Sequence, residues 1–222
     1  MCGRFTLTAA TKKLAEAFAG YQIPAELPPR YNIAPTQPVA VIANNGQRRL
    51  EFFQWGLIPA WAKDPTIGNR MINARAETLA EKPTFKNAYK RRRCLVLADG
   101  FFEWQKVNGG KTPMYIRLAS GEPFAFAGLW ESWHGPADSP LLSCTIITTT
   151  PNALLANIHN RMPVILPPAA YELWLEPGER SPAQLDGLLK PYPAEAMVAY
   201  PVSTLVNNPK NDLLDCIAPL TD

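Results

Sequence analysis

Residues 94–129, CLVLADGFFEWQKVNGGKTPMYIRLASGEPFAFAGL, decide the fold of this 222-residue chain. Apolar runs at 94–98 and 101–107 are followed by two more near 114–118 and 123–129. The intervening segments carry Asn108-Gly109-Gly110 and Ser120-Gly121, whose residues tolerate the backbone angles of tight turns. The stretch therefore predicts consecutive strands that pair antiparallel across short connections.

The same pattern continues on both sides of this stretch. Paired strands are predicted at 39–43 and 48–55, around the turn sequence Asn44-Asn45-Gly46. Further strands are predicted near 141–148, 163–166 and 197–202. Helices are predicted at 9–19, 151–157, 168–175 and 182–189. Thr8 and Thr150 are the expected N-caps of the first two helices, and Gly20 the expected end of the first. The predicted class is α+β, largely antiparallel strands with short flanking helices, in a single domain over residues 1–222.

Composition excludes several classes of protein. The chain has 23 prolines and 13 glycines, and only 18% of its residues are charged. Proline breaks helices and central strands, so this usage excludes a coiled coil and a long helical bundle, and the low charge excludes a charged disordered chain. A net charge of +3 does not by itself indicate a nucleic-acid binder. Any basic surface must come from the placement of the charges.

Cysteine and histidine usage argues against a metal site. The cysteines are Cys2, Cys94, Cys144 and Cys216, far apart and without a C-x-x-C pair, and the chain has 2 histidines. These residues do not assemble a zinc framework, so we expect no metal, no cofactor and free thiols in a reducing compartment. The sequence shows no leader peptide and no apolar run of membrane-spanning length, so we expect a cytoplasmic protein without a membrane partner.

Cys2 is the first candidate for chemistry. Removal of Met1 would leave an N-terminal cysteine, whose amine has a reference pKa of about 7.7–8.0 and whose thiol has one near 8.5. Such an aminothiol suits an N-terminal-nucleophile amidohydrolase. It also suits capture of an aldehyde, first as a Schiff base and then as a thiazolidine. A small packed cysteine is the alternative interpretation.

Four further segments, in this order, resemble the SRAP family of SOS-response-associated and abasic-site proteins. They are Ile72-Asn73-Ala74-Arg75-Ala76-Glu77, Ala98-Asp99-Gly100-Phe101-Phe102-Glu103-Trp104, Ile158-His159-Asn160-Arg161-Met162-Pro163-Val164, and Pro201-Val202-Ser203 with Val206-Asn207-Asn208. The resemblance runs from Cys2 to about Asn211. It implies one α+β domain with a mixed, barrel-like sheet.

The resemblance implies a protein that crosslinks itself to abasic sites in single-stranded DNA through a thiazolidine on Cys2, shielding the lesion from strand cleavage. It also implies autopeptidase and weak lyase activity. Asn73 would orient the amine, and Glu103 and His159 would move protons, as a poorly solvated carboxyl and an imidazole can near pH 7. By pattern alone, the favoured interpretation of Asn73 is a strand-to-helix cap. Glu103 is equally a solvent-facing residue on a sheet edge, and an ordinary loop residue is the alternative for His159.

DNA contacts are predicted next to these residues. Arg4, Arg75 and Arg161 each lie close in sequence to a proposed catalytic residue and are candidate phosphate ligands. Trp55 and Trp61 are candidates to stack on unpaired bases, or else they pack in the core. Asn32 and Pro35 match a family segment that lines the site. The basic run Lys90-Arg91-Arg92-Arg93 is read as a solvated face.

Two other functions stay open at this stage: a thiol peptidase or amidohydrolase that uses Cys2 and His159, and a non-catalytic single-stranded DNA-binding module. The expected partner is single-stranded DNA with abasic sites. We expect a monomer in the bacterial cytoplasm, associated with the nucleoid when bound to DNA, with replication-fork proteins as candidate partners.

Overall fold

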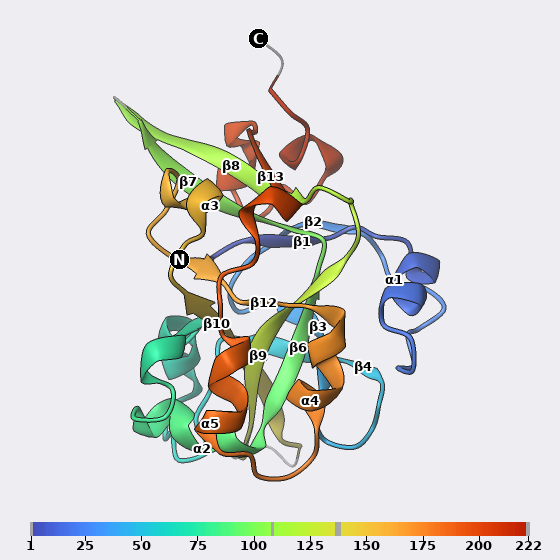
Figure 1. Ribbon diagram of the computed structural model, residues 1–222, viewed down its shortest axis with the longest axis vertical. Coiled ribbons are helices and arrows are strands. Elements are labelled where there is room, and N and C mark those ends of the chain that lie inside the picture. Colours follow the sequence, from blue (N-terminus) through green and yellow to red (C-terminus); the bar gives the residue numbers. More distant parts are fainter. Residues whose placement is uncertain (1, 108, 136–138, 221–222) are drawn as a thin grey trace.

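The computed structural model describes residues 2–107, 109–135 and 139–220, and five of its strands close into a barrel. These strands are β3 (Pro38–Ala43), β4 (Leu50–Trp55), β6 (Arg93–Ala98), β9 (Phe124–Trp133) and β10 (Leu141–Thr149). The order around the barrel is β10-β4-β3-β6-β9, and β9 pairs with β10 to close it (Figure 1). Only the β10–β4 pairing among these is parallel, so the barrel is mixed and largely antiparallel.

Three short strands extend the barrel. β5 (Asn73–Arg75) lies parallel to β10, β11 (Met162–Pro163) antiparallel to β10, and β12 (Ile165–Leu166) antiparallel to β9. Segments far apart in the sequence are thereby fixed against the barrel wall.

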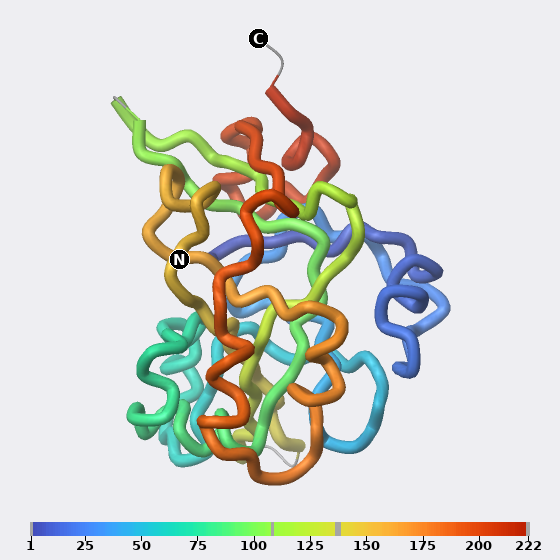
Figure 2. Tube along the Cα trace, viewed as in Figure 1, coloured from blue at the N-terminus to red at the C-terminus, as the bar shows by residue number. Residues whose placement is uncertain are grey.

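A second sheet of five strands lies against one end of the barrel (Figures 1 and 2). Its order is β13 (Met197–Pro201), β8 (Gly110–Leu118), β7 (Gly100–Val107), β1 (Phe5–Leu7) and β2 (Arg30–Ile33), and every pairing is antiparallel. Strands β6 and β7 are separated by Asp99 alone. At that residue the chain leaves the barrel and enters the second sheet.

Short helices cover the outside of both sheets. The α-helices are α1 (Thr11–Ala17), α2 (Pro83–Arg91), α3 (Ala153–Ala156), α4 (Tyr171–Leu175) and α5 (Pro182–Leu185). The 3-10 turns are Pro65–Arg70, Ala76–Thr78, Pro168–Ala170, Asp186–Leu188, Ala194–Ala196, Thr204–Asn207 and Leu214–Cys216. Within the described part of the chain, every helix falls short of the length and apolarity needed to cross a bilayer.

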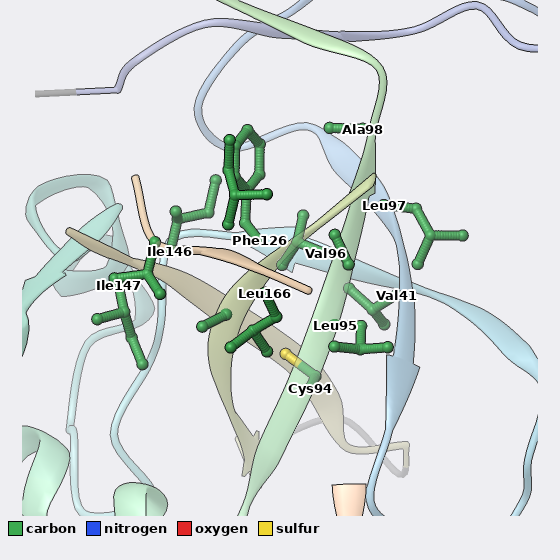
Figure 3. Close-up of a cluster of buried hydrophobic side chains, with 14 of the residues drawn as sticks. Val41, Cys94, Leu95, Val96, Leu97, Ala98, Phe126, Ile146, Ile147 and Leu166 are labelled. Carbon is green, nitrogen blue, oxygen red and sulfur yellow. The ribbon is translucent and has the colours of Figure 1, made fainter. Parts of the chain in front are cut away.

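The apolar core fills the barrel and continues to the second sheet. Figure 3 shows side chains of β6, β9 and β10 converging, with Phe126 above Val96 and Ile146. Phe126 makes edge-to-face contacts with Phe5 of β1 and Phe101 of β7, at centroid distances of 5.7 and 5.9 Å. Aromatic packing therefore joins the two sheets as one apolar cluster.

The predicted α+β class and the mixed, barrel-like sheet are confirmed, as are the turns at Gly46 and Gly121, which both have positive φ. The turn predicted at 108–110 includes residue 108, which lies outside the described residues. The assignment of residues 1–222 to one domain stays a prediction. Helix α2 and strands β1, β2 and β5 were not predicted, because they are short or lie in segments rich in proline and charge.

The two predicted helix caps were wrong. The Thr8 hydroxyl donates to Asp99 at 2.8 Å, and α1 begins without a side-chain cap. Asn152, which accepts from the Leu155 amide, caps α3 in place of Thr150. Thr8 is bound instead by Asp99, a partner distant in sequence, and Thr150 is replaced by Asn152, a cap two residues further along the chain.

Candidate active site

Strand β1 carries Cys2 into the interior. Phe5 pairs with Ile33 on one side and Phe101 on the other, and the Phe102 amide donates to the Arg4 carbonyl at 2.9 Å. Cys2, just before this strand, is 0% exposed. A residue beside the chain end is thus as buried as the centre of the core.

Asp99 anchors β1 where the barrel meets the second sheet. Its Oδ1 accepts from the Thr6 hydroxyl at 2.5 Å, and its Oδ2 accepts from the Thr8 amide at 2.5 Å and the Ala9 amide at 2.7 Å. Hydrogen bonds to a carboxylate are about twice as strong as neutral ones. This cluster therefore fixes the position of β1, and with it Cys2. Asp99 was not predicted as an anchor, although it lies within one of the four family-like segments.

Asn73 holds Cys2 from the other side. It lies on β5 and pairs with Ile146 of the barrel strand β10. Its Nδ2 donates to the Cys2 carbonyl at 2.8 Å, while its buried Oδ1 has no hydrogen-bond partner among the described residues. The alternative role of Asn73 as a helix cap is excluded, because Arg75 occupies the N-cap position of the following 3-10 turn. Asn73 thus offers one orienting donor and one free acceptor beside Cys2.

Glu103 is a buried carboxyl close to Cys2. It is 2% exposed on β7, and its burial raises its pKa, while the positive charge of His159 acts in the opposite direction. Phe101 packs in the barrel-side core and Phe102 in a separate cluster, as predicted from the alternation along this strand. A carboxyl with a raised pKa holds its proton to higher pH than an ordinary glutamate and is better suited to donate it.

The Cys2 thiol is held in its protonated form. Burial raises its pKa, and the nearby negative charge of Glu103 raises it further. His159 follows α3, and its Nδ1 accepts from the Arg161 amide at 3.1 Å. The same Nδ1 lies 3.2 Å from the Arg161 carbonyl oxygen, so both contacts hold the ring in place. The structure thus brings together all four residues predicted to be catalytic, Cys2, Asn73, Glu103 and His159.

A cavity of about 550 Å³ opens beside Glu103 and His159. It lies between the β7–β8 hairpin and the segment that follows α3, which are neighbours in Figure 1. The Gln105 amide bridges these two walls by donating to the Asn157 carbonyl at 3.0 Å. The remaining residues that line the cavity are Trp104, Lys106, Lys111, Ala156, Asn157, Ile158 and Asn160. The lysines of this wall were not predicted, because nothing in the sequence relates the hairpin to His159.

Arg4 and Asn32 form an internal network. The Arg4 guanidinium donates to Asn32 Oδ1 at 2.7 Å and to the Val206 carbonyl at 2.6 Å, and it lies 5.9 Å from the ring centroid of Trp104. The buried Asn32 amide donates to the carbonyls of Asn208 and Asn211 at 3.1 and 2.6 Å. Both side chains therefore tie the C-terminal segment to β1 and β2.

Arg161 is also engaged within the protein. Its guanidinium makes a two-pronged ion pair with Glu77 at 2.7 and 2.9 Å and donates to the Thr148 carbonyl at 2.5 Å. Arg75 is exposed on β5 and makes no ion pair with the described residues. Of the three arginines predicted to bind phosphate, Arg75 alone is exposed and outside any ion pair with the described residues, although its charge still acts on Glu77.

The predicted aromatic and loop residues are in unlike environments. Trp61 is 63% exposed, whereas Trp55 is fully buried at the end of β4 and donates to the Ile72 carbonyl at 2.9 Å. The core-packing alternative for Trp55 therefore holds, because its ring has no open face for a base. Pro35 is half-buried after β2.

The basic run Lys90–Arg93 is bound internally. Lys90 and Arg91 pair with Glu179, and Arg92 pairs with Glu131 at 2.7 Å. Arg93 is 0% exposed, and burial lowers its pKa to about 10. Its guanidinium donates to several main-chain carbonyls, including that of Trp174. Over the described ranges, no group of His, Cys, Asp and Glu side chains is arranged to hold a metal.

The fold and these contacts define an α+β protein with a buried, near-terminal thiol set between a barrel and a second sheet. The family described as SOS response associated peptidase (SRAP) matches residues 1–209. The chain belongs to this family.

Several relatives are named for their action on DNA lesions. The Abasic site processing protein YoqW of Bacillus subtilis is 50% identical over 216 residues, which span 96% of each chain, and YoaM of the same organism is 49% identical over 97% of this chain and 98% of its own. The Abasic site processing protein HMCES of Gallus gallus is 32% identical over 99% of this chain and 78% of its own. A crystal structure of a Bacteroides thetaiotaomicron protein aligns with a TM-score of 0.87 and 30% identity, covering 99% of this chain and all of that one.

Proposed function

We propose that this protein processes abasic sites by crosslinking itself to single-stranded DNA through a thiazolidine on Cys2, after removal of Met1. The observation that carries the proposal is the fully buried Cys2, held by Asn73 and adjoining Glu103. The names of the related proteins support abasic sites as the target.

The first step is imine formation. The Cys2 amine attacks C1′ of the ring-opened deoxyribose, and the carbinolamine loses its hydroxyl as water. Asn73, which donates to the Cys2 carbonyl at 2.8 Å, fixes the direction of the amine. Glu103, whose raised pKa favours its protonated form, donates the proton to the departing hydroxyl. His159 takes up and returns protons during opening of the sugar ring.

The second step is ring closure. The Cys2 sulfur adds to the imine carbon, and the thiol proton ends on the nitrogen. The sum is aldehyde plus amine plus thiol giving thiazolidine plus water, with no oxidant or reductant. Because thiol and amine belong to one residue, closure gains the high effective concentration of an intramolecular reaction. The saturated ring removes the electron sink that promotes β-elimination, so closure protects the strand, and weak lyase activity is expected when closure is blocked.

DNA would approach through the exposed groups of the site. Arg75 is exposed and free to bind a phosphate, and Trp61 offers an open ring for stacking on a base. Arg4, Arg161 and Pro35 would shape the walls of the site and contact DNA through their exposed surface, and the fully buried Asn32 would contribute by holding Arg4. We extend the proposal to a monomer that acts in the bacterial cytoplasm, with replication-fork proteins as candidate partners.

The test is incubation with a single-stranded oligonucleotide containing one abasic site, followed by denaturing electrophoresis and intact mass spectrometry. We expect a shifted band whose mass is protein lacking Met1 plus oligonucleotide minus one water. Cys2→Ser should bind the oligonucleotide without forming the thiazolidine, whereas Cys144→Ala, which removes a buried barrel thiol, should crosslink. A native protein that gives no shifted band contradicts the proposal.

A second candidate activity is thiol peptidase action by Cys2 and His159. It is favoured by the family's description as a peptidase. Self-removal of Met1 would let this activity coexist with crosslinking. The test is to purify His159→Ala from cells that have no other activity able to remove Met1 from this sequence, and to measure its mass. Retention of Met1 supports self-processing by the protein, and loss of Met1 contradicts self-processing.

A further inference from the structure

We propose that Lys106 and Lys111, a cross-strand pair of the β7–β8 hairpin, form a phosphate-binding site that holds the backbone of the DNA strand a few nucleotides from the lesion. The inference rests on the proposed function in one respect, which is that DNA is the ligand of the cavity beside Glu103 and His159.

The position of the pair is the first observation. Lys106 and Lys111 are register partners near the tip of the hairpin and line the same cavity as Glu103 and His159. Strand β1 pairs with β7 at Gly100 and Phe101, and from Glu103 onward no described residue pairs as a strand with the side of β7 away from β8. The cavity follows this open edge, and a strand entering it passes the lysines.

Charge is the second observation. Both lysines are exposed, and neither forms an ion pair with any described residue. Like charges directly opposite on paired strands repel and destabilise the hairpin. A phosphate bound between the two lysines would relieve this repulsion. The pair is therefore more stable with a bound anion than without one.

The surrounding cations are the third observation. Arg4 is engaged by Asn32 and a main-chain carbonyl, and Arg161 by Glu77. Among the described residues that line the cavity, the positive charges without an acidic partner are therefore those of Lys106 and Lys111. Lysine is a compact charge that binds phosphate without a fixed geometry, so it suits a backbone contact that is independent of sequence.

The spacing limits which phosphate is bound. Lys106 follows Glu103 by three residues, and at about 3.3 Å per strand residue their Cα atoms are roughly 10 Å apart. Stacked nucleotides of one strand advance about 3.4 Å each, so this distance spans about three of them. The bound phosphate thus lies within a few nucleotides of the abasic site.

The test measures the salt dependence of binding to a single-stranded oligonucleotide with a tetrahydrofuran abasic analogue, which has no aldehyde and does not crosslink. Each phosphate contact on single strands contributes a slope of about −0.7 in log K against log salt. The double variant Lys106→Gln/Lys111→Gln should bind more weakly and, by losing one phosphate contact, reduce the steepness by about 0.7. Lys12→Gln/Lys190→Gln, two exposed lysines on α1 and after α5, removes the same charge elsewhere and should leave the slope unchanged.

A second measurement locates the contact. Single methylphosphonate substitutions, which neutralise one phosphate at a time, should weaken binding of the native protein at one or two positions near the lesion and leave the hairpin variant insensitive there. An unchanged slope in the hairpin variant, or an equal change in the control, overturns the inference. The native protein's crosslinking of an aldehyde-bearing oligonucleotide is scored separately, so an intact crosslink with an unchanged slope rejects only the lysine site.

Discussion

The barrel and the second sheet each bury a glutamate, and the two glutamates differ in what surrounds them. Glu131 of the barrel strand β9 is 5% exposed and forms an ion pair with Arg92 at 2.7 Å. Glu103 of the second sheet is 2% exposed and borders an open cavity together with His159. Burial raises the pKa of both carboxyls. The barrel thus compensates its buried charge within its own wall, whereas the second sheet keeps one at a cavity that a substrate can enter.

The largest effect is expected where the two regions meet. Phe126→Ala should lower the free energy of unfolding by about 3–5 kcal/mol, because Phe126 packs on both Phe5 and Phe101 and its loss leaves a cavity. Urea denaturation measures this change. Phe52→Ala, at a site 54% exposed on β4, is the control and should stay within about 0.5 kcal/mol. Similar losses for the two variants would mean that the regions are not joined through Phe126.

Asp99→Ala tests whether Asp99 positions Cys2 as well as stabilising the fold. It removes hydrogen bonds to Thr6, Thr8 and Ala9, and we expect a loss of about 3 kcal/mol, or about 6–12 °C in Tm. The rate of crosslinking should also fall at temperatures where the variant is folded, because β1 no longer fixes Cys2. The exposed Asp64, which bonds only to Thr66, is the matched control as Asp64→Ala. A folded Asp99→Ala protein with a native crosslinking rate would refute the positioning role.

Glu103→Gln should stabilise the protein while slowing its reaction. A carboxyl with a folded pKa above its unfolded pKa contributes stability at pH below the unfolded value, near 4.5, and loses it as the pH rises through the folded value. The advantage of the variant should therefore be absent near pH 4 and grow as the pH rises towards neutral, where its Tm should exceed that of the native protein. Paired melting curves across this range measure the difference.

Glu131→Gln is the counterpart in the barrel. It leaves Arg92 without its carboxylate partner, so crosslinking should continue at the native rate without a gain in stability at neutral pH. Equal effects of the two glutamine variants on crosslinking would contradict the prediction that Glu103 takes part in the reaction and Glu131 does not.

The smallest effect is expected at the tip of the hairpin. Lys106→Glu replaces a like-charged pair with an opposite-charged one across from Lys111, so the free energy of unfolding should rise by about 0.5 kcal/mol. Affinity for single-stranded DNA should fall in the same variant. Calorimetry and a binding titration, run on one preparation, test the two halves of this prediction. A fall in stability would show that the lysines do not repel each other in the folded protein.

The barrel was predictable from sequence because its strands are marked locally. Strands β3, β4, β6 and β9 are apolar runs, and Gly46 between β3 and β4 and Gly121 between β8 and β9 have the positive φ of a turn. Strand β5 has no apolar run or turn signal of this kind. Its three residues form a strand because β10 of the barrel is there to pair with them. Tertiary pairing decides short strands of this kind.

The four candidate catalytic residues were predicted from motifs, and their proximity is now observed, while their roles stay predictions. What the sequence did not reveal was which charges are free. Arg4 and Arg161 looked like phosphate ligands because they flank the motifs, yet their partners Asn32 and Glu77 lie 28 and 84 residues away in the chain. A hydrogen bond or ion pair over such separations follows from the fold and not from local spacing.

The burial of Cys2 has a practical consequence for how the protein is produced. A purification tag or fusion partner on the N-terminal side would have to pass through the interior, where Cys2 is 0% exposed and its carbonyl is bound by Asn73. It would also leave the proposed nucleophile without a free amine. Leu220, at the other end of the described chain, is 52% exposed and offers an attachment point without this conflict. Recombinant versions meant to react should therefore carry their affinity handles at the carboxyl end.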